Sequence, residues 1–164
     1  MADIVKESGL SSGAIYSHYA SKADLLRQVM ASALTDRFAL FDPTAGSTPS
    51  TPEALLDRLL QGPSADRSQT SVLVQVWGEM SKDPELTAVA DENLGHLRRL
   101  LTAALLPWAR EADVGDDQIA AAKADEAAQS LITLSFGYAV RLALQPGTDG
   151  RDLKRALLSA ARLL

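Results

Sequence analysis

Apolar residues recur at helical spacing along almost the whole chain. Behind Ser21, leucine, valine and methionine side chains repeat every three or four residues towards Phe38, and the same period returns in later segments. Residues 71–77 (SVLVQVW) alternate apolar and polar side chains, but this run is short and isolated, and its neighbours favour a helix. The pattern therefore predicts an all-α chain.

Helix-start signals stand in front of the apolar segments. Each combines a capping side-chain oxygen with a first-turn proline or acidic residue, or, at the first start, with an aspartate three residues later. The predicted starts are Ser21, Thr51, Asp83 and Asp116, and a last helix is expected over roughly residues 151–164. Two stretches rich in helix-breaking residues, 42–51 and 61–68, are expected to be loops.

The segment from residue 116 to residue 145 carries unusually many small side chains. Alanine, serine and glycine are interspersed there with large apolar residues, which appear on more than one helical face. Small side chains let helices approach closely, and apolar residues on several faces indicate burial on several sides. We therefore expect this helix to be covered by neighbours on several sides.

Composition narrows the class of protein. The chain has 164 residues, of which 46% are hydrophobic and 23% charged, as in one globular domain with at most a small appendage. It holds no cysteine, which excludes disulfides and thiolate metal sites and fits a cytoplasmic location. The net charge is -5 and the first 28 residues are neutral, so any contact with DNA must be local.

Residues 9–13 (GLSSG) match the pattern around the nucleophilic serine of many hydrolases. That motif needs a strand before Ser11 and a histidine within reach of it. Residues 2–8 favour a helix instead, and His18 would lie about two turns further along the helix that follows Ser11, too far away. His96 has no second histidine at a metal-site spacing. We therefore expect no enzymatic activity, no catalytic residue, no metal and no cofactor.

The same letters fit a helix-turn-helix residue by residue. Gly9 suits a left-handed turn, and Ser11 caps the next helix with its hydroxyl. Ile15 and Tyr19, four residues apart, form the inner stripe of that short helix. Lys22 stands near the next helix start, against the helix dipole, which favours an anionic partner. The outer face is expected to consist of Ser12, Ala14, Ser17 and His18, with Gly13 allowing close backbone approach.

Residues 2–26 (ADIVKESGLSSGAIYSHYASKADLL) resemble the DNA-binding domain of TetR-type transcriptional repressors. The shared pattern is a glycine turn, a hydroxyl cap, a glycine, then Y-x-H-aromatic and S-K-x-x-L-L. The resemblance implies that residues 12–19 form the recognition helix, with Tyr16 and Lys22 on the DNA backbone. His18 fits either a phosphate donor or a solvated surface residue. The implied DNA-binding residues are Ser11, Ser12, Gly13, Tyr16, Ser17, His18 and Lys22.

The sequence departs from that family at its start. The family's DNA-binding domain has a helix before this pair, and the chain begins where the family enters its second helix. We therefore expect an incomplete three-helix unit in the chain as given and weak operator binding. The resemblance divides the chain into a partial helix-turn-helix domain with a connecting helix, residues 1–36, and a helical effector-binding and dimerisation domain, residues 37–164.

The resemblance also implies a function. The chain would be a ligand-responsive repressor that binds a palindromic double-stranded DNA operator as a homodimer, without a membrane, and is released by a small, largely apolar effector. The alternative is a helical ligand-binding or interaction module that does not bind DNA.

The same resemblance places two further groups of residues. The effector pocket is expected around Trp77, Met80, His96, Leu97, Leu101, Trp108, Phe136 and Tyr138, although plain core packing also explains the large residues among them. The dimer interface is expected on the last two helices, at Leu131, Ser135, Tyr138, Leu142, Leu153, Leu157 and Ala161. The basic residues of the last helix are expected at solvent or at the dimer rim, namely Arg151, Lys154, Arg155 and Arg162.

Overall fold

The computed structural model describes residues 18–21, 24, 51–61, 67–112 and 116–164. Its helices are α4 (Pro52–Leu59), α5 (Arg67–Met80), α6 (Pro84–Ala112), α7 (Asp117–Leu144) and α8 (Gly150–Ala161), and these described ranges contain no strand. The prediction of an all-α chain is confirmed. Residues 71–77 lie inside α5, so the alternating run is helical as expected.

Helices α4, α6 and α7 begin where the capping signals predicted, and α8 is capped by Asp149, which was not predicted. In each case a side-chain oxygen accepts a hydrogen bond from a first-turn backbone N–H, which satisfies a donor that the helix itself leaves unpaired. The pairs are Thr51 with Ala54 (3.2 Å), Asp83 with Glu85 (2.9 Å), Asp116 with Gln118 (2.8 Å) and Asp149 with Arg151 (2.8 Å). Because Asp149 is the cap, the last helix starts at Gly150, one residue before the expected position.

The segment expected as a loop over residues 61–68 is shorter than predicted. Helix α5 begins at Arg67, inside that segment, and residues 42–50 of the other expected loop lie outside the described residues. Two hydroxyls in the first turn of α5 donate to the carbonyl oxygen of Arg67, from Thr70 and Ser71, both at 2.9 Å. The Arg67 side chain is itself held by the end of α7, so a tertiary contact determines this helix start.

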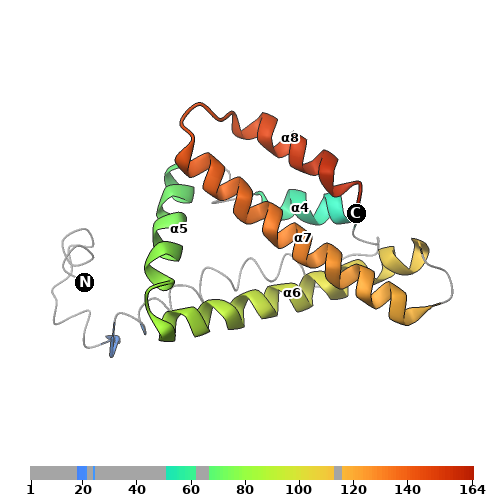
Figure 1. Cartoon of the computed structure of the whole chain (residues 1–164), viewed down its shortest axis with the longest axis horizontal. Helices are drawn as coiled ribbons and strands as arrows, with labels where there is room; N and C mark the ends of the chain where they lie inside the picture. The colour runs from blue at the N-terminus through green and yellow to red at the C-terminus, as the bar shows by residue number, and fades with distance from the viewer. Residues whose placement is uncertain (1–17, 22–23, 25–50, 62–66, 113–115) are drawn as a thin grey trace.

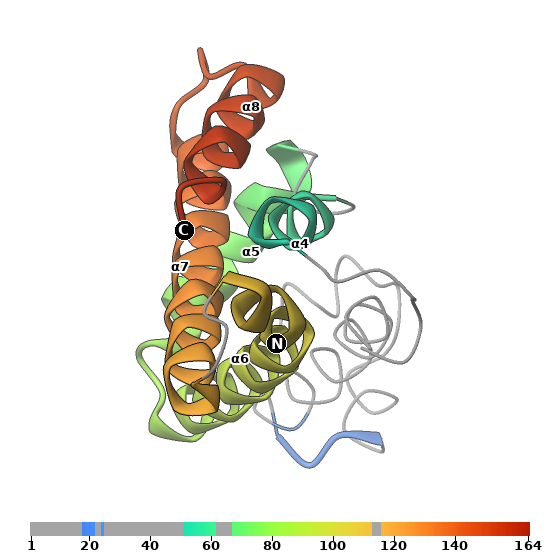
Figure 2. The ribbon, with the colours of Figure 1, turned by 90° about the vertical axis from the view of Figure 1, so that its right-hand side faces the viewer.

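Helix α7 is the centre of the fold and packs against α4, α5, α6 and α8. In Figure 1, α5 spans the space between the end of α7 and the beginning of α6, so that α5, α6 and α7 form the sides of a triangle. The view in Figure 2 shows α8 beside the upper part of α7, with α4 next to it. The expectation that the helix from residue 116 is covered on several sides is confirmed.

The core is built from leucines on α4 and α6 and from small residues on α7. Leu55, Leu101, Leu105 and Leu131 are completely buried in one cluster. The α7 residues that face α6 and α4 are mostly small, which allows close packing of the long helices. The buried alanines of α7 in this cluster are Ala120, Ala124, Ala127 and Ala128.

Candidate functional site

Of the seven residues predicted to contact DNA, the structure describes one, His18. His18 is helical and exposed, and Tyr19, predicted to face inward, is half-buried. The other six candidates lie outside the described residues: Ser11, Ser12, Gly13, Tyr16, Ser17 and Lys22.

The turn after this segment shows the predicted cap. The backbone N–H of Asp24 donates to Ser21 Oγ at 3.0 Å, and Asp24 Oδ2 in return accepts from the backbone N–H of Ala20 at 3.1 Å. This is a variant of the reciprocal capping box, shifted by one residue on the return bond. His18 is helical and Tyr19 is not, so the helix that contains His18 ends one residue before the predicted end at Tyr19.

Two of the predicted effector-pocket residues form an aromatic pair. The rings of Trp77 on α5 and Phe136 on α7 are stacked, with centroids 4.1 Å apart and planes inclined by 18°. Both side chains are half-buried. Such stacking adds to the stabilisation from burial alone and holds α5 against α7 at this point.

The other predicted pocket residues are spread through the body. Met80 is buried in a small separate cluster with Leu86, whereas Leu101 is completely buried in the main core, where Leu97 packs against it. His96 is half-buried on α6.

Trp108 lies far from the stacked pair. It is near the end of α6, where the ammonium of Lys123 lies 5.2 Å from the centroid of its ring. Lys123 and Phe136 are 13 positions apart on α7, which corresponds to about 20 Å along the helix. The structure therefore brings Trp77 and Phe136 together and places Trp108 at the other end of α7.

The described residues also form an open cleft of about 470 Å³ between the ends of α4 and α7 and the beginnings of α5 and α8. Of the residues predicted for the effector pocket, only Tyr138 lines it. The described residues that line it are Leu60, Gln61, Arg67, Tyr138, Leu142, Asp149, Gly150, Arg151 and Lys154.

Arg67 ties one wall of the cleft together. Its Nη2 donates to the carbonyl oxygens of Gln145 at 2.8 Å, Pro146 at 3.1 Å and, more weakly, Thr148 at 3.5 Å. A cation at this position satisfies carbonyls that the end of α7 leaves open and is favoured by the helix dipole. No sequence pattern pointed to this contact, because 78 positions separate Arg67 from Gln145.

Tyr138 forms part of the cleft floor and is 3% exposed. Burial raises the pKa of its hydroxyl, an effect opposed by the Lys154 ammonium and reinforced by the Asp149 carboxylate. The hydroxyl therefore stays a neutral donor, and its oxygen lies 3.5 Å from the carbonyl oxygen of Gly150. The hydrogen bonds from the first backbone N–H groups of α8 lower the pKa of Asp149.

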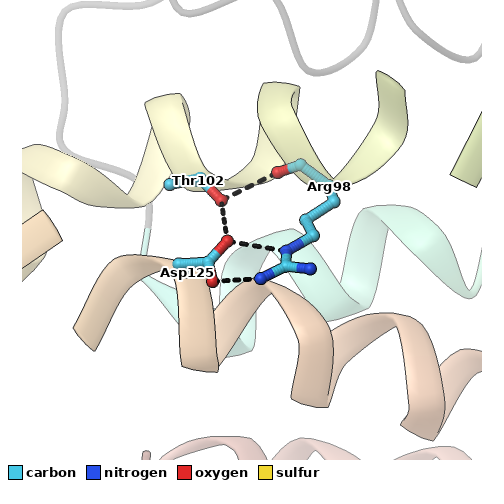
Figure 3. Close-up of polar contacts among 3 residues, drawn as sticks. All are labelled: Arg98, Thr102 and Asp125. Carbon is cyan, nitrogen blue, oxygen red and sulfur yellow. Dashed lines mark hydrogen bonds and ion pairs between the residues drawn. The ribbon is translucent and has the colours of Figure 1, made fainter. Parts of the chain in front are cut away.

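A polar cluster joins α6 to α7 further along (Figure 3). Arg98 Nε donates to Asp125 Oδ1 at 2.7 Å, and its Nη2 donates to Asp125 Oδ2. The Thr102 hydroxyl lies 2.9 Å from the carbonyl oxygen of Arg98 and 3.4 Å from Asp125 Oδ1. The two-pronged pair fixes the relative register of the two long helices, in a geometry that guanidinium and carboxylate favour.

We expect the Tm of the Asp125→Asn variant to fall less than that of the wild type when the pH is lowered. Hydrogen bonds from Arg98 hold the pKa of Asp125 below its ordinary value of 3.8, against the opposing effect of burial. This stabilisation is fully present above the ordinary pKa and is lost as the pH falls through the lowered one. Thermal melts between about pH 7 and about pH 3 should therefore show a smaller fall in Tm for the variant.

The matched test for this pair is a double-mutant cycle with Arg98→Gln. Because both side chains are partly exposed, each single change should have a modest effect, and the double variant should lose less than the sum of the two. Additive losses, or an unchanged acid dependence in Asp125→Asn, would show that the pair contributes nothing to folding.

The basic residues of α8 were predicted to face solvent or a dimer rim, and two of them pair with α4. Arg162 Nε donates to Glu53 Oε2 at 2.7 Å and its Nη2 to Oε1 at 2.5 Å, while Lys154 Nζ lies 2.7 Å from Asp57 Oδ1. Glu53 opens α4 and meets the end of α8, so the two helices run antiparallel. Arg162 is exposed, as predicted, although its guanidinium pairs with Glu53. Lys154 is half-buried against α4, because the sequence could not place α4 beside α8.

Five of the seven residues predicted for the dimer interface are buried within this single chain. Their exposed fractions are at most 8%, and they belong to the main core cluster: Leu131, Tyr138, Leu142, Leu153 and Ala161. Leu157 packs against the same cluster and Ser135 is half-buried, with its hydroxyl donating to the carbonyl oxygen of Ile132 at 2.7 Å. These side chains stabilise the protomer, and their surface is already covered by its own helices.

A different stripe of α7 is open. Thr133, Gly137, Val140 and Leu144 recur at helical spacing and all are exposed, Leu144 by 67%. A methyl group added at Gly137 would meet no atom within 4 Å. We refer to these four residues as the α7 stripe.

Comparison with protein families gives two matches. Residues 52–161 match the C-terminal domain of BetI-type transcriptional repressors, and residues 1–29 match the family described as bacterial regulatory proteins, tetR family. The chain belongs to the TetR family. Searches of curated proteins and of solved structures give no significant match to this TetR-family chain.

Family membership establishes the general role of this TetR-family protein. It is a transcription regulator of the repressor class, and the match over residues 1–29 assigns its DNA-binding helix-turn-helix to the segment that contains the predicted recognition helix. The second match, which covers α4 to α8, assigns the helical body to the C-terminal half of such repressors.

The described residues of this TetR-family chain contain no group of three or more histidine, aspartate or glutamate side chains that could hold a metal ion. Helix α7 has the length and apolar composition of a membrane span, a test that the core helix of a soluble protein also passes. Its position at the centre of the fold, against four other helices, accounts for that composition.

Proposed function

We propose that this TetR-family protein is a ligand-responsive, cytoplasmic repressor that binds a palindromic DNA operator as a homodimer. The observation that supports this most is the presence of both family matches in one chain, a DNA-binding segment at residues 1–29 and a repressor body at residues 52–161. We place the division between a helix-turn-helix domain with its connecting helix and an effector-binding and dimerisation domain after residue 36.

In this proposal the helix over residues 12–19 enters the major groove. Tyr16 and Lys22 contact the DNA backbone and set the register of the helix, while small polar side chains face the base edges. The exposed position of His18 and the cap at Ser21 support this arrangement, since they leave the outer face of the segment open at its end.

We expect Lys22→Gln to weaken binding to all DNA sequences and to flatten the salt dependence. A lysine that neutralises one phosphate releases about one counterion, so a dimer that carries the change twice should lose about two units of slope in a plot of log K against log salt. Fluorescence anisotropy with a labelled operator at several salt concentrations measures both effects.

Lys82→Gln is the matched control for this change. Lys82 is an exposed lysine in the turn between α5 and α6, its ammonium lies 2.9 Å from Glu79 Oε1, and it is outside residues 1–29, which match the DNA-binding family. If the slope of log K against log salt is the same in Lys22→Gln and the wild type, Lys22 does not contact the DNA backbone. Failure of the wild-type chain to bind any DNA even at low salt would favour the alternative, a helical ligand-binding module.

We propose that the effector is a small, largely apolar molecule that binds among α5, α6 and α7, beside the stacked rings of Trp77 and Phe136. These rings are half-buried and belong to α5 and α7, which supports an apolar ligand at this place. The effector would release DNA only to the extent that it binds one arrangement of the dimer more tightly than the other.

We propose that α7 and α8 form the dimer interface, with the α7 stripe at its centre. Its residues are small or apolar and exposed, so two copies of α7 could cross closely at Gly137. A two-fold dimer presents two recognition helices to two half-sites, about one turn of DNA apart or a similar spacing, which explains the expected palindrome.

A further inference from the structure

The cleft between α4, α5, α7 and α8 has no role in the function proposed above. It lies at the turn between α7 and α8, whereas the stacked aromatic pair lies further down α7, between α5 and α7. At about 470 Å³ it is within the range of small-molecule sites.

The described residues that line the cleft carry more positive than negative charges. Arg67, Arg151 and Lys154 are among them, with one carboxylate, Asp149. The Asp57 carboxylate, which lies 2.7 Å from Lys154 Nζ, neutralises that lysine. Among the described residues, these three cations and two carboxylates leave a net charge of +1, which favours a ligand with a single negative charge.

Arg151 is the cation best placed to meet such a ligand. It is exposed at the first turn of α8, whereas the ammonium of Lys154 is engaged by Asp57 and one guanidinium nitrogen of Arg67 by the carbonyls at the end of α7. A guanidinium binds a carboxylate through two parallel hydrogen bonds, which makes Arg151 a suitable anchor.

Apart from Gln61, the other described side chains that line the cleft are largely apolar. Leu60 and Leu142 are almost completely buried beneath its surface, and the ring of Tyr138 lies with them. A ligand held by its charge at Arg151 would therefore lay an uncharged, apolar body against this floor. The neutral Tyr138 hydroxyl is the one polar group of that floor.

We propose that this cleft is a second ligand site, which binds a small organic monocarboxylate with an apolar body. The site differs from the proposed effector site in place, since it involves α4 and α8 rather than α6, and in the charge of its ligand. Its occupation would bridge residues at the ends of α4 and α7 and at the beginnings of α5 and α8. The proposal does not depend on DNA binding or on the identity of the effector.

The test is isothermal titration calorimetry on the full chain without DNA. The probes are butyrate, hexanoate and benzoate, and the uncharged control is hexanamide, which has the same apolar body as hexanoate. We expect saturable binding of at least one carboxylate and no detectable binding of the amide. Arg151→Gln should weaken the carboxylate by about ten- to a hundredfold, the loss expected for one charged hydrogen-bonded contact, and Arg151→Lys by less.

Arg155→Gln is the matched control variant. Arg155 lies one turn further along α8, is exposed, donates to Asp152 at 2.8 Å and does not line the cleft, so its loss should leave carboxylate binding unchanged. Absence of saturable binding by all three carboxylates would overturn the proposal, as would equal binding of hexanamide or unchanged binding in Arg151→Gln. Operator binding measured on the same variants reports on the proposed repressor function separately.

Discussion

Replacement of Gly137 by arginine is expected to convert the proposed homodimer into a folded monomer. Within the protomer the new side chain has open space, because a Cβ at Gly137 meets no atom within 4 Å, and α7 gains a residue that favours helix more than glycine does. In a close crossing of two α7 helices the same side chain would bring bulk and charge into the contact. We expect the dimer dissociation constant to rise by about a hundredfold or more, measured by analytical ultracentrifugation.

Gly78→Arg provides a matched control for this change. Gly78 is also exposed, also within a helix, and its added Cβ also meets no atom within 4 Å, but it lies on α5. This variant should remain a dimer and bind the operator as the wild type does. If Gly137→Arg is still a dimer, or if both variants dissociate equally, the α7 stripe is not the interface.

Leu131→Ala is expected to destabilise the protomer itself, by about 2–5 kcal/mol, the usual loss for truncating a completely buried leucine. Leu131 is 0% exposed in the main core cluster, so the truncation leaves a cavity among the surrounding helices. For a chain of this size Tm should fall by about 2–4 °C for each kcal/mol. The measurement is thermal and urea unfolding followed by circular dichroism.

The decisive comparison repeats this substitution in the Gly137→Arg background. Truncating a core side chain destabilises the protomer whether or not it is part of a dimer. Leu131→Ala should therefore lower the free energy of unfolding by the same amount in both backgrounds. If Leu131 acted mainly across the dimer interface, as the sequence suggested, its effect would disappear in the monomer. Leu144→Ala, at a side chain that is 67% exposed, should change the stability of that monomer by no more than about 0.5 kcal/mol.

Local signals in the sequence were reliable for the helices. The caps at Thr51, Asp83 and Asp116 and the cap of Asp24 by Ser21 are all present, because a capping hydrogen bond involves residues only two or three positions apart. Residues 71–77 were correctly predicted to be helical, because the alternating run is short and the residues beside it favour a helix. The resemblance of residues 2–26 to TetR-type repressors rested on an ordered local motif, and the family matches confirm the family.

The sites of the body were less predictable. The expected pocket gathered large side chains that the structure separates, with Trp77 stacked on Phe136 and Trp108 near the opposite end of α7. The expected dimer residues were placed on the last two helices by the resemblance, which cannot distinguish a side chain covered by its own chain from one left for a partner. The DNA-contact assignments at Tyr16 and Lys22 remain predictions.

By itself the sequence determined the helical class, the helix starts and membership of a repressor family, since these depend on capping, periodicity and a contiguous motif. The tertiary structure alone decided which faces of α7 are buried, the pairing of Arg98 with Asp125, and the cleft where Arg67 reaches the end of α7. The partners in these contacts are 27 and 78 positions apart. Their approach depends on how whole helices pack, and the local pattern of residues does not encode it.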